Sequence, residues 1–135
     1  MESIMRSIAF LFCALILLQG CKKESATNSD LPKSFSITVD FQTGFNNDLA
    51  VIFLDGESIA LVDSITTDPI ITLAASRKFT AAPGTHTLAV VIPKDSVNAD
   101  TTFFHDEKNL WIGVNYNRGQ RKINYLFQYL PFPYR

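Results

Sequence analysis

The stretch Ser34-Phe35-Ser36-Ile37-Thr38-Val39-Asp40-Phe41 alternates polar and apolar side chains without a break. Successive side chains of a β-strand point to opposite faces of its sheet, so this stretch has one apolar face and one wet face. It therefore predicts a half-buried strand at the start of the folded part of the chain.

More strand-like segments follow, and two turn sequences join four of them into hairpins. Asp55-Gly56 links residues 49–54 to 59–65, and Asn117-Arg118-Gly119 links residues 110–116 to 123–129. A polar loop is expected at 95–100. The other expected strands are 70–74, a short piece around Phe79, 85–92 and 101–104.

The whole pattern favours an all-β domain. No window after the leader shows the i, i+3, i+4, i+7 spacing of an amphipathic helix. About seven to nine short strands separated by turn residues are typical of an antiparallel sandwich or barrel. We take the antiparallel β-sandwich as the expected fold, with Leu88, Val90 and Ile92 on the buried face of their strand.

The beginning of the chain has the features of an export signal. Arg6 precedes an uncharged, mostly apolar run over residues 8–18. This run is too short to span a bilayer, for which a helix needs about 20 residues. A base followed by a short apolar run is typical of a secretory signal, with translation starting at either Met1 or Met5.

The end of that run, Leu18-Gln19-Gly20-Cys21, resembles the lipobox of bacterial lipoproteins. The resemblance implies cleavage before Cys21, a diacylglycerol on its sulfur and an acylated amino group. It also implies a membrane anchor in the bacterial cell envelope. Lys22 stands where an Asp would resemble an inner-membrane retention signal. We therefore expect the outer membrane, with the periplasmic or surface face left open.

These features divide the chain into three parts. Residues 1–20 are the expected lipoprotein signal peptide, residues 21–33 the lipidated cysteine with a polar flexible tether, and residues 34–135 the β-sandwich domain. The two cysteines, Cys13 and Cys21, both precede the domain. An exported domain without a disulfide must rely on its hydrophobic core for stability.

Two segments of the domain resemble a known family of small bacterial surface repeats. Leu54-Asp55-Gly56 and Pro83-Gly84-Thr85-His86-Thr87-Leu88 are similar to the PEGA pattern, in which a strand ends in Asp-Gly and a later strand reads Gly-x-His-x-apolar. Transthyretin-like and immunoglobulin-like sandwiches fit the order of the strands equally well.

The composition argues against several classes of function. The 12 basic and 13 acidic residues leave no positive excess for binding nucleic acid. The sequence has no Gly-x-Ser-x-Gly, no His-Glu-x-x-His and no phosphate-binding glycine loop. His86 is expected at a strand edge and His105 in a solvated turn. We expect no enzymatic activity, no catalytic residue, no metal and no cofactor.

The charges are unevenly distributed along the chain. Residues 30–68 carry seven acids and one base, whereas residues 77–135 carry eight bases and four acids. The strands of a sandwich interleave in space, so we expect the two groups to mix on the surface.

Aromatic residues crowd the last third of the chain. Trp111 has the opposite parity to Leu110 and Ile112, which places it on the outer face of its strand. With Tyr125 and Tyr129 it forms the candidate binding surface. The alternative is that these rings pack on the sandwich and that the tail, residues 130–135, seals its edge.

The expected function is that of a non-catalytic lipoprotein, a binding or structural accessory module at the cell envelope. Its expected partners are the membrane, through the lipid on Cys21, and an envelope protein. The alternative is a glycan-binding surface module that uses Trp111 and Tyr125, and a hydrolase is the third and least favoured reading.

Overall fold

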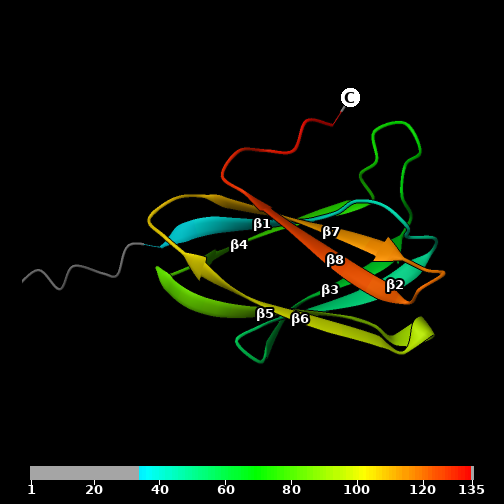
Figure 1. Ribbon diagram of the computed structural model, residues 1–135, viewed down its shortest axis with the longest axis horizontal. Coiled ribbons are helices and arrows are strands. Elements are labelled where there is room, and N and C mark those ends of the chain that lie inside the picture. Colours follow the sequence, from blue (N-terminus) through cyan, green and yellow to red (C-terminus); the bar gives the residue numbers. More distant parts are fainter. Residues whose placement is uncertain (1–33, 135) are drawn as a thin grey trace, which may run out of the picture. The chain divides into compact units, whose positions relative to one another are not determined.

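The alternating stretch at residues 34–41 forms the first strand of a two-layered β-structure (Figure 1). The structure is a computed structural model that describes residues 34–134, so the predicted lipobox with Cys21 and the tether lie outside the described residues. A short 3₁₀ turn, η2 (Pro93–Asp95), lies between residues 92 and 97. The strands are β1 (Phe35–Phe41), β2 (Asp48–Leu54), β3 (Glu57–Ile65), β4 (Ala75–Ala81), β5 (Gly84–Ile92), β6 (Val97–His105), β7 (Leu110–Asn117) and β8 (Lys122–Gln128).

The strands form two four-stranded sheets that pack face to face (Figure 1). The first sheet has the order β4-β1-β7-β8 and the second has the order β3-β2-β5-β6. Neighbouring strands are antiparallel except β1 and β7, which pair in parallel. The predicted β-sandwich is therefore confirmed. No hairpin joins β1 to β7, which are far apart in sequence, so the chain can enter both strands in the same direction.

The core lies between the sheets and follows the predicted alternation. In the first sheet, Ile37 and Val39 on β1 are fully buried, as is Ile112 on β7. In the second sheet, Leu88, Val90 and Ile92 are fully buried on β5, as expected from the sequence. The two expected hairpins, β2–β3 and β7–β8, are also present.

Two expected elements are wrong. Residues 70–74 form a turn instead of a strand, because the Asp68 carboxylate accepts hydrogen bonds from the N–H groups of Ile70 (2.7 Å) and Ile71 (3.2 Å). Local bonds of this kind compete with a β-ladder, and Ile70 is left 79% exposed. The expected loop at 95–100 is shorter than predicted, since Ser96 reverses the chain with φ of 50° and β6 begins at Val97.

After β8 the chain turns back toward the first sheet. Residues 129–134, which we call the C-terminal strap, run above that sheet in Figure 1. The hydroxyl of Tyr134 reaches Asp40 and Gln42, which belong to β1 and the residue that follows it. Among residues 34–134, no helix has the length and hydrophobicity needed to cross a bilayer.

Candidate functional site

The outer face of the first sheet, which we call the strap face, carries polar side chains in a regular grid. Thr38 and Asp40 on β1 point outward because Ile37, Val39 and Phe41 fill the core. The parallel register sets Thr38 beside Trp111 and Asp40 beside Gly113. An indole, a carboxylate and a glycine therefore share this face.

The strap covers a continuous chain of hydrogen bonds on this face. Ser76 Oγ donates to Asp40 Oδ1 at 2.6 Å, and Tyr134 Oη donates to Asp40 Oδ2 at 2.7 Å. Tyr134 Oη in turn accepts from Gln42 Nε2 at 3.2 Å. Gln42 Oε1 accepts from Asn115 Nδ2 at 2.9 Å. Both polar side-chain atoms of Gln42 are thus hydrogen-bonded. The hydrogen bonds are all donated in the direction of the Asp40 carboxylate.

Burial gives this network its strength. Asp40 is only 3% exposed, although it is an acidic residue on the outer face of a sheet. Burial raises the pKa of Tyr134, and the hydrogen bond to Asp40 raises it further, so the hydroxyl keeps its proton and donates to Asp40. Hydrogen bonds to an ionised acceptor are stronger than those between neutral groups.

Gly113 provides the room for Gln42. A Cβ atom at this position would lie 2.7 Å from Gln42 Nε2 and 2.8 Å from Gln42 Oε1. The amide therefore occupies the space that any other residue at 113 would fill.

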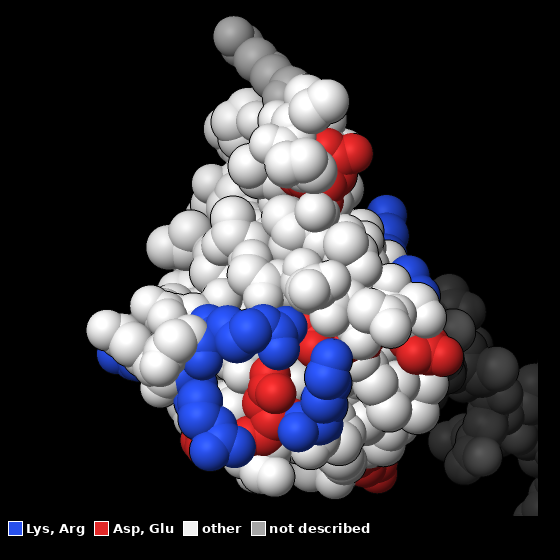
Figure 2. Space-filling model, turned by 90° about the vertical axis from the view of Figure 1, so that its right-hand side faces the viewer, with Lys and Arg blue, Asp and Glu red and all other residues white. Residues whose placement is uncertain are grey.

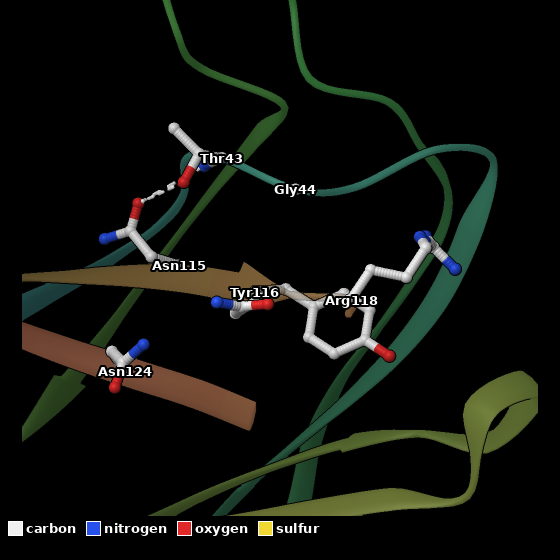
Figure 3. A pocket seen from close by; sticks show the side chains of 7 residues that line it. Thr43, Gly44, Asn115, Tyr116, Arg118 and Asn124 are labelled. Carbon is white, nitrogen blue, oxygen red and sulfur yellow. Dashed lines mark hydrogen bonds between the residues drawn. The ribbon is translucent and has the colours of Figure 1, made fainter. Parts of the chain in front are cut away.

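A shallow hollow of about 470 Å³ opens at one end of the strap face (Figure 3). Thr43 and Asn115 point toward each other in Figure 3 and share a hydrogen bond of 2.7 Å. The lining is rich in amides and hydroxyls, which suit a ligand with many hydroxyl groups. It consists of Thr43, Gly44, Asn115, Tyr116, Asn117, Arg118 and Asn124.

Beside this hollow, Arg118 bridges two carboxylates. Its guanidinium lies 2.5 Å from Asp48 Oδ2 and 2.8 Å from Asp95 Oδ2, and its Cζ is 5.2 Å from the centre of the Tyr116 ring. Asp95 also accepts the Tyr116 hydroxyl at 2.6 Å and, through its carbonyl, a bond from Arg121. Burial, followed by the bond to Asp95, raises the pKa of Tyr116 to about 12.

This ion cluster joins the acidic and basic halves of the sequence. Asp48 belongs to the acidic half and Arg118 to the basic half. Figure 2 shows the same end of the sandwich, where basic side chains surround acidic ones. Since both carboxylates already have a guanidinium partner, the cluster is more suited to fastening the β7–β8 turn than to binding a cation.

The structure separates the three residues of the predicted binding surface. Trp111 is half-buried on the strap face, on the side that parity predicted. Tyr125 packs against the core, and its hydroxyl donates to the carbonyl of Ala99 at 2.7 Å. Tyr129 is 48% exposed and begins the strap. Trp111 and Tyr129 are therefore available to a ligand, whereas Tyr125 offers only part of its ring.

The two histidines have separate environments. His86 Nδ1 lies 2.7 Å from Asp55 Oδ2, and His86 Nε2 lies 2.8 Å from the carbonyl oxygen of Ala82. His105 was expected in a solvated turn but is fully buried at the end of β6. Its Nε2 faces the carbonyl of Lys108 at 2.8 Å, and its Nδ1 has no partner among the described residues.

The apolar edge is a further feature of the surface, and Tyr129 is the one member of it that the sequence singled out. Of the nine large apolar residues that are exposed within residues 34–134, five lie on β6, β8 and the strap. Phe103 of β6 stacks on Phe127 of β8, with ring centres 5.6 Å apart, and so links the edges of the two sheets. The five exposed residues are Phe104, Leu126, Phe127, Tyr129 and Leu130.

Sequence reasoning also missed Asp40, Gln42 and Tyr134. The outward parity of Asp40 was visible in the alternating stretch, but nothing local to it indicated that the strap would bury it. Within residues 34–134, no group of three or more His, Cys, Asp or Glu side chains is arranged to hold a metal ion. Comparisons with protein-family models, with curated proteins and with solved structures found no match to this chain.

Proposed function

We propose that this protein is a non-catalytic lipoprotein of the bacterial cell envelope, anchored by lipid on Cys21, that binds a protein partner. The observation that carries the proposal is the apolar edge defined above. Exposed apolar area that is concentrated along one edge of a monomer is more often used in protein contact than single scattered apolar side chains are. Aromatic residues are also enriched at such contacts.

The position of the cluster supports a protein partner rather than a small ligand. β6 and β8 are the last strands of their sheets, so both also present unpaired backbone groups. A partner segment can hydrogen-bond to such an edge while apolar side chains supply contact area. The diacylglycerol and the N-acyl chain expected on Cys21 would hold the domain at the membrane, since a single chain gives only reversible attachment.

The test is site-specific photo-crosslinking in membranes of the native host. A benzophenone amino acid replaces Phe104 or Leu130 on the apolar edge, or Ile59 on β3 as a matched control, because Ile59 is an exposed apolar residue on the opposite edge strand. We expect one discrete adduct at positions 104 and 130 and none at 59. Equal adducts at all three positions, or none at any, would contradict the proposal.

The anchor is tested separately. Cys21→Ser should move the protein from the membrane fraction to the soluble fraction, because the sulfur that carries the lipid is gone. A variant that still sediments with membranes and resists salt extraction would show that the lipobox interpretation is wrong.

The second candidate function is a glycan-binding module. It is favoured by the strap face, where the half-buried Trp111 shares a surface with the amides of Gln42 and Asn115 and the carboxylate of Asp40. Sugar rings stack on aromatic side chains through their C–H groups, and their hydroxyls hydrogen-bond to amides and carboxylates.

A further inference from the structure

The Tyr134 hydroxyl takes part in the network as an alcohol that both donates and accepts. It donates to the Asp40 carboxylate and accepts from the Gln42 amide. A hydroxyl group can do both at once, whereas a carbonyl or an ammonium group cannot. The strap face therefore offers an acceptor and a donor arranged around one hydroxyl oxygen.

The strap is held to the sheet at few points. It lies outside the strand ladders, and Leu130 within it is 74% exposed. At its start, Gln128 Nε2 donates to the carbonyl of Leu130 at 2.6 Å. Within residues 129–134, the remaining bonds to the sheet are the two made by the Tyr134 hydroxyl. Segments that few hydrogen bonds join to the rest of the fold open at a lower free-energy cost than the paired strands do.

The surface beneath the strap has the composition of a sugar-binding site. Asp40 and Gln42 lie at the centre, Asn115 extends the row toward the amide-lined hollow, and Trp111 lies on the next row of the same face. Gly113 carries no side chain between them, and the Gln42 amide lies over it, within reach of a ligand that replaces the strap. A few oriented polar groups beside an aromatic ring are typical of ligand sites.

We propose that the strap face is a carbohydrate-binding site that the strap occupies in this structure, with the Tyr134 hydroxyl in the position of a sugar hydroxyl. The inference rests on the second function proposed above. Strap and sugar compete for Asp40 and Gln42, so the fraction of molecules with an open strap sets the apparent affinity. The strap thereby keeps a polar site covered until a sugar of sufficient affinity displaces it.

The test measures binding of the hexasaccharides of glucose, mannose and N-acetylglucosamine to the detergent-solubilised chain by calorimetry. The variants are a truncation after Gln128, the same truncation with Asp40→Asn, and Tyr134→Phe in the full-length chain. We expect the truncated chain to bind at least one of the sugars about tenfold more tightly than the whole chain. Asp40→Asn should reduce that gain, because it replaces the ionised acceptor of the sugar hydroxyl with a weaker neutral one.

The outcomes distinguish carbohydrate binding itself from competition between the strap and the carbohydrate. If the truncated chain is folded and binds a sugar no more tightly than the whole chain, the competing strap is wrong while glycan binding stands. If no folded variant binds any of the sugars, both are wrong. If the truncated chain stays monomeric while the whole chain forms dimers that Tyr134→Phe dissolves, the site takes the strap of a second copy and the carbohydrate assignment is overturned.

Tyr134→Phe keeps the proposal testable if the truncated chain does not fold. It removes one hydroxyl and leaves the rest of the strap in place. It should tighten sugar binding severalfold, since Asp40 and Gln42 lose their hydrogen bonds to the Tyr134 hydroxyl. Both groups are then free to bond to a sugar hydroxyl. Unchanged binding in this variant would overturn the competition.

Discussion

At the scale of single residues, two glycines with similar backbones make a matched test of the turn at residues 42–47. Gly44 has φ of +88° and Gly56 has φ of +85°. A Cβ on Gly44 would lie 1.6 Å from the carbonyl oxygen of Tyr116, whereas a Cβ on Gly56 would meet nothing within 4 Å. Gly56→Ala should therefore cost about 1–2 kcal/mol of unfolding free energy, for the left-handed backbone alone.

Gly44→Ala should cost about 4 kcal/mol or more, because the backbone must also move away from Tyr116. Urea unfolding of both variants measures the difference. Equal losses for the two variants would show that the close approach of Gly44 to β7 is absent.

The ion cluster at Arg118 makes a second prediction at this scale. Asp48 is fully buried, and its Oδ2 accepts from Arg118 and from the backbone N–H of Asn46. Arg118→Ala leaves that carboxylate without its counter-ion. We expect the free energy of unfolding to fall by about 2–4 kcal/mol. This is below the full cost of a buried unpaired charge, because the Arg118 side chain is 39% exposed and water can enter when it is removed.

Arg77→Ala is the control for Arg118→Ala, because Arg77 is exposed on β4 and, within the described part of the chain, its side chain bonds only to the neighbouring Ser76 carbonyl. Arg77→Ala should lower the free energy of unfolding by no more than about 0.5 kcal/mol. Thermal melts that do not separate the two variants would contradict a stabilising role for the cluster.

At the scale of elements, alternation along the strands was enough to predict a β-sandwich, but not the order of the strands within each sheet. It identified the buried faces of β1, β5 and β7 because each strand has one face in the core. It failed at residues 70–74, where apolar residues suggested a strand but the Asp68 side chain closes a turn. Hydrophobicity alone does not distinguish a strand from a loop whose backbone is satisfied locally.

The candidate site was predictable only in part. Parity placed Trp111 on the outer face of β7, but the contact between Tyr134 and Asp40 joins residues 94 positions apart. Such a contact depends on how the strap folds back, and no local pattern encodes that. The parallel pairing of β1 with β7, which sets Asp40 beside Gly113, is equally non-local.

The predicted register of β5 can be tested by two aspartates on opposite faces of this strand. Val90 is fully buried between the sheets, whereas Thr85 is exposed. Val90→Asp should cost about 3–5 kcal/mol because it buries an unpaired charge. Thr85→Asp should cost under about 1 kcal/mol. Melting temperatures that fall equally would show that the face of β5 is assigned wrongly.

At the scale of the whole molecule, one ion pair makes the stability depend on pH. Asp55, in the β2–β3 turn, binds His86 on β5, and its other oxygen accepts the Thr87 N–H at 2.8 Å. These bonds lower the pKa of Asp55 below its ordinary value of 3.8. Burial lowers the pKa of His86, but the bonds to Asp55 and to the Ala82 carbonyl outweigh it and raise the pKa above 6.5.

The raised pKa of His86 and the lowered pKa of Asp55 stabilise the folded state over different ranges of pH. A histidine whose pKa is raised by folding stabilises the folded state below the pKa of the unfolded chain, and this contribution is lost as the pH rises through the folded-state value. A carboxyl whose pKa is lowered stabilises the folded state above its unfolded value, and this is lost as the pH falls through the folded-state value. The pair therefore contributes most between about pH 4 and pH 6.5.

We predict that His86→Gln destabilises the protein more at pH 5.5 than at pH 8.5, because a larger fraction of the wild-type histidine carries, at the lower pH, the proton that both of its acceptors need. The measurement is the urea midpoint of the wild type and the variant at the two pH values. His105, whose ring centre lies 6.2 Å from that of His86, is retained in both proteins. Asp55→Asn should reduce the pH dependence in the same way, since it removes the charge that favours the imidazolium. A constant difference between wild type and His86→Gln across this range would show that the histidine is neutral in the folded protein and that its contact with Asp55 does not depend on charge.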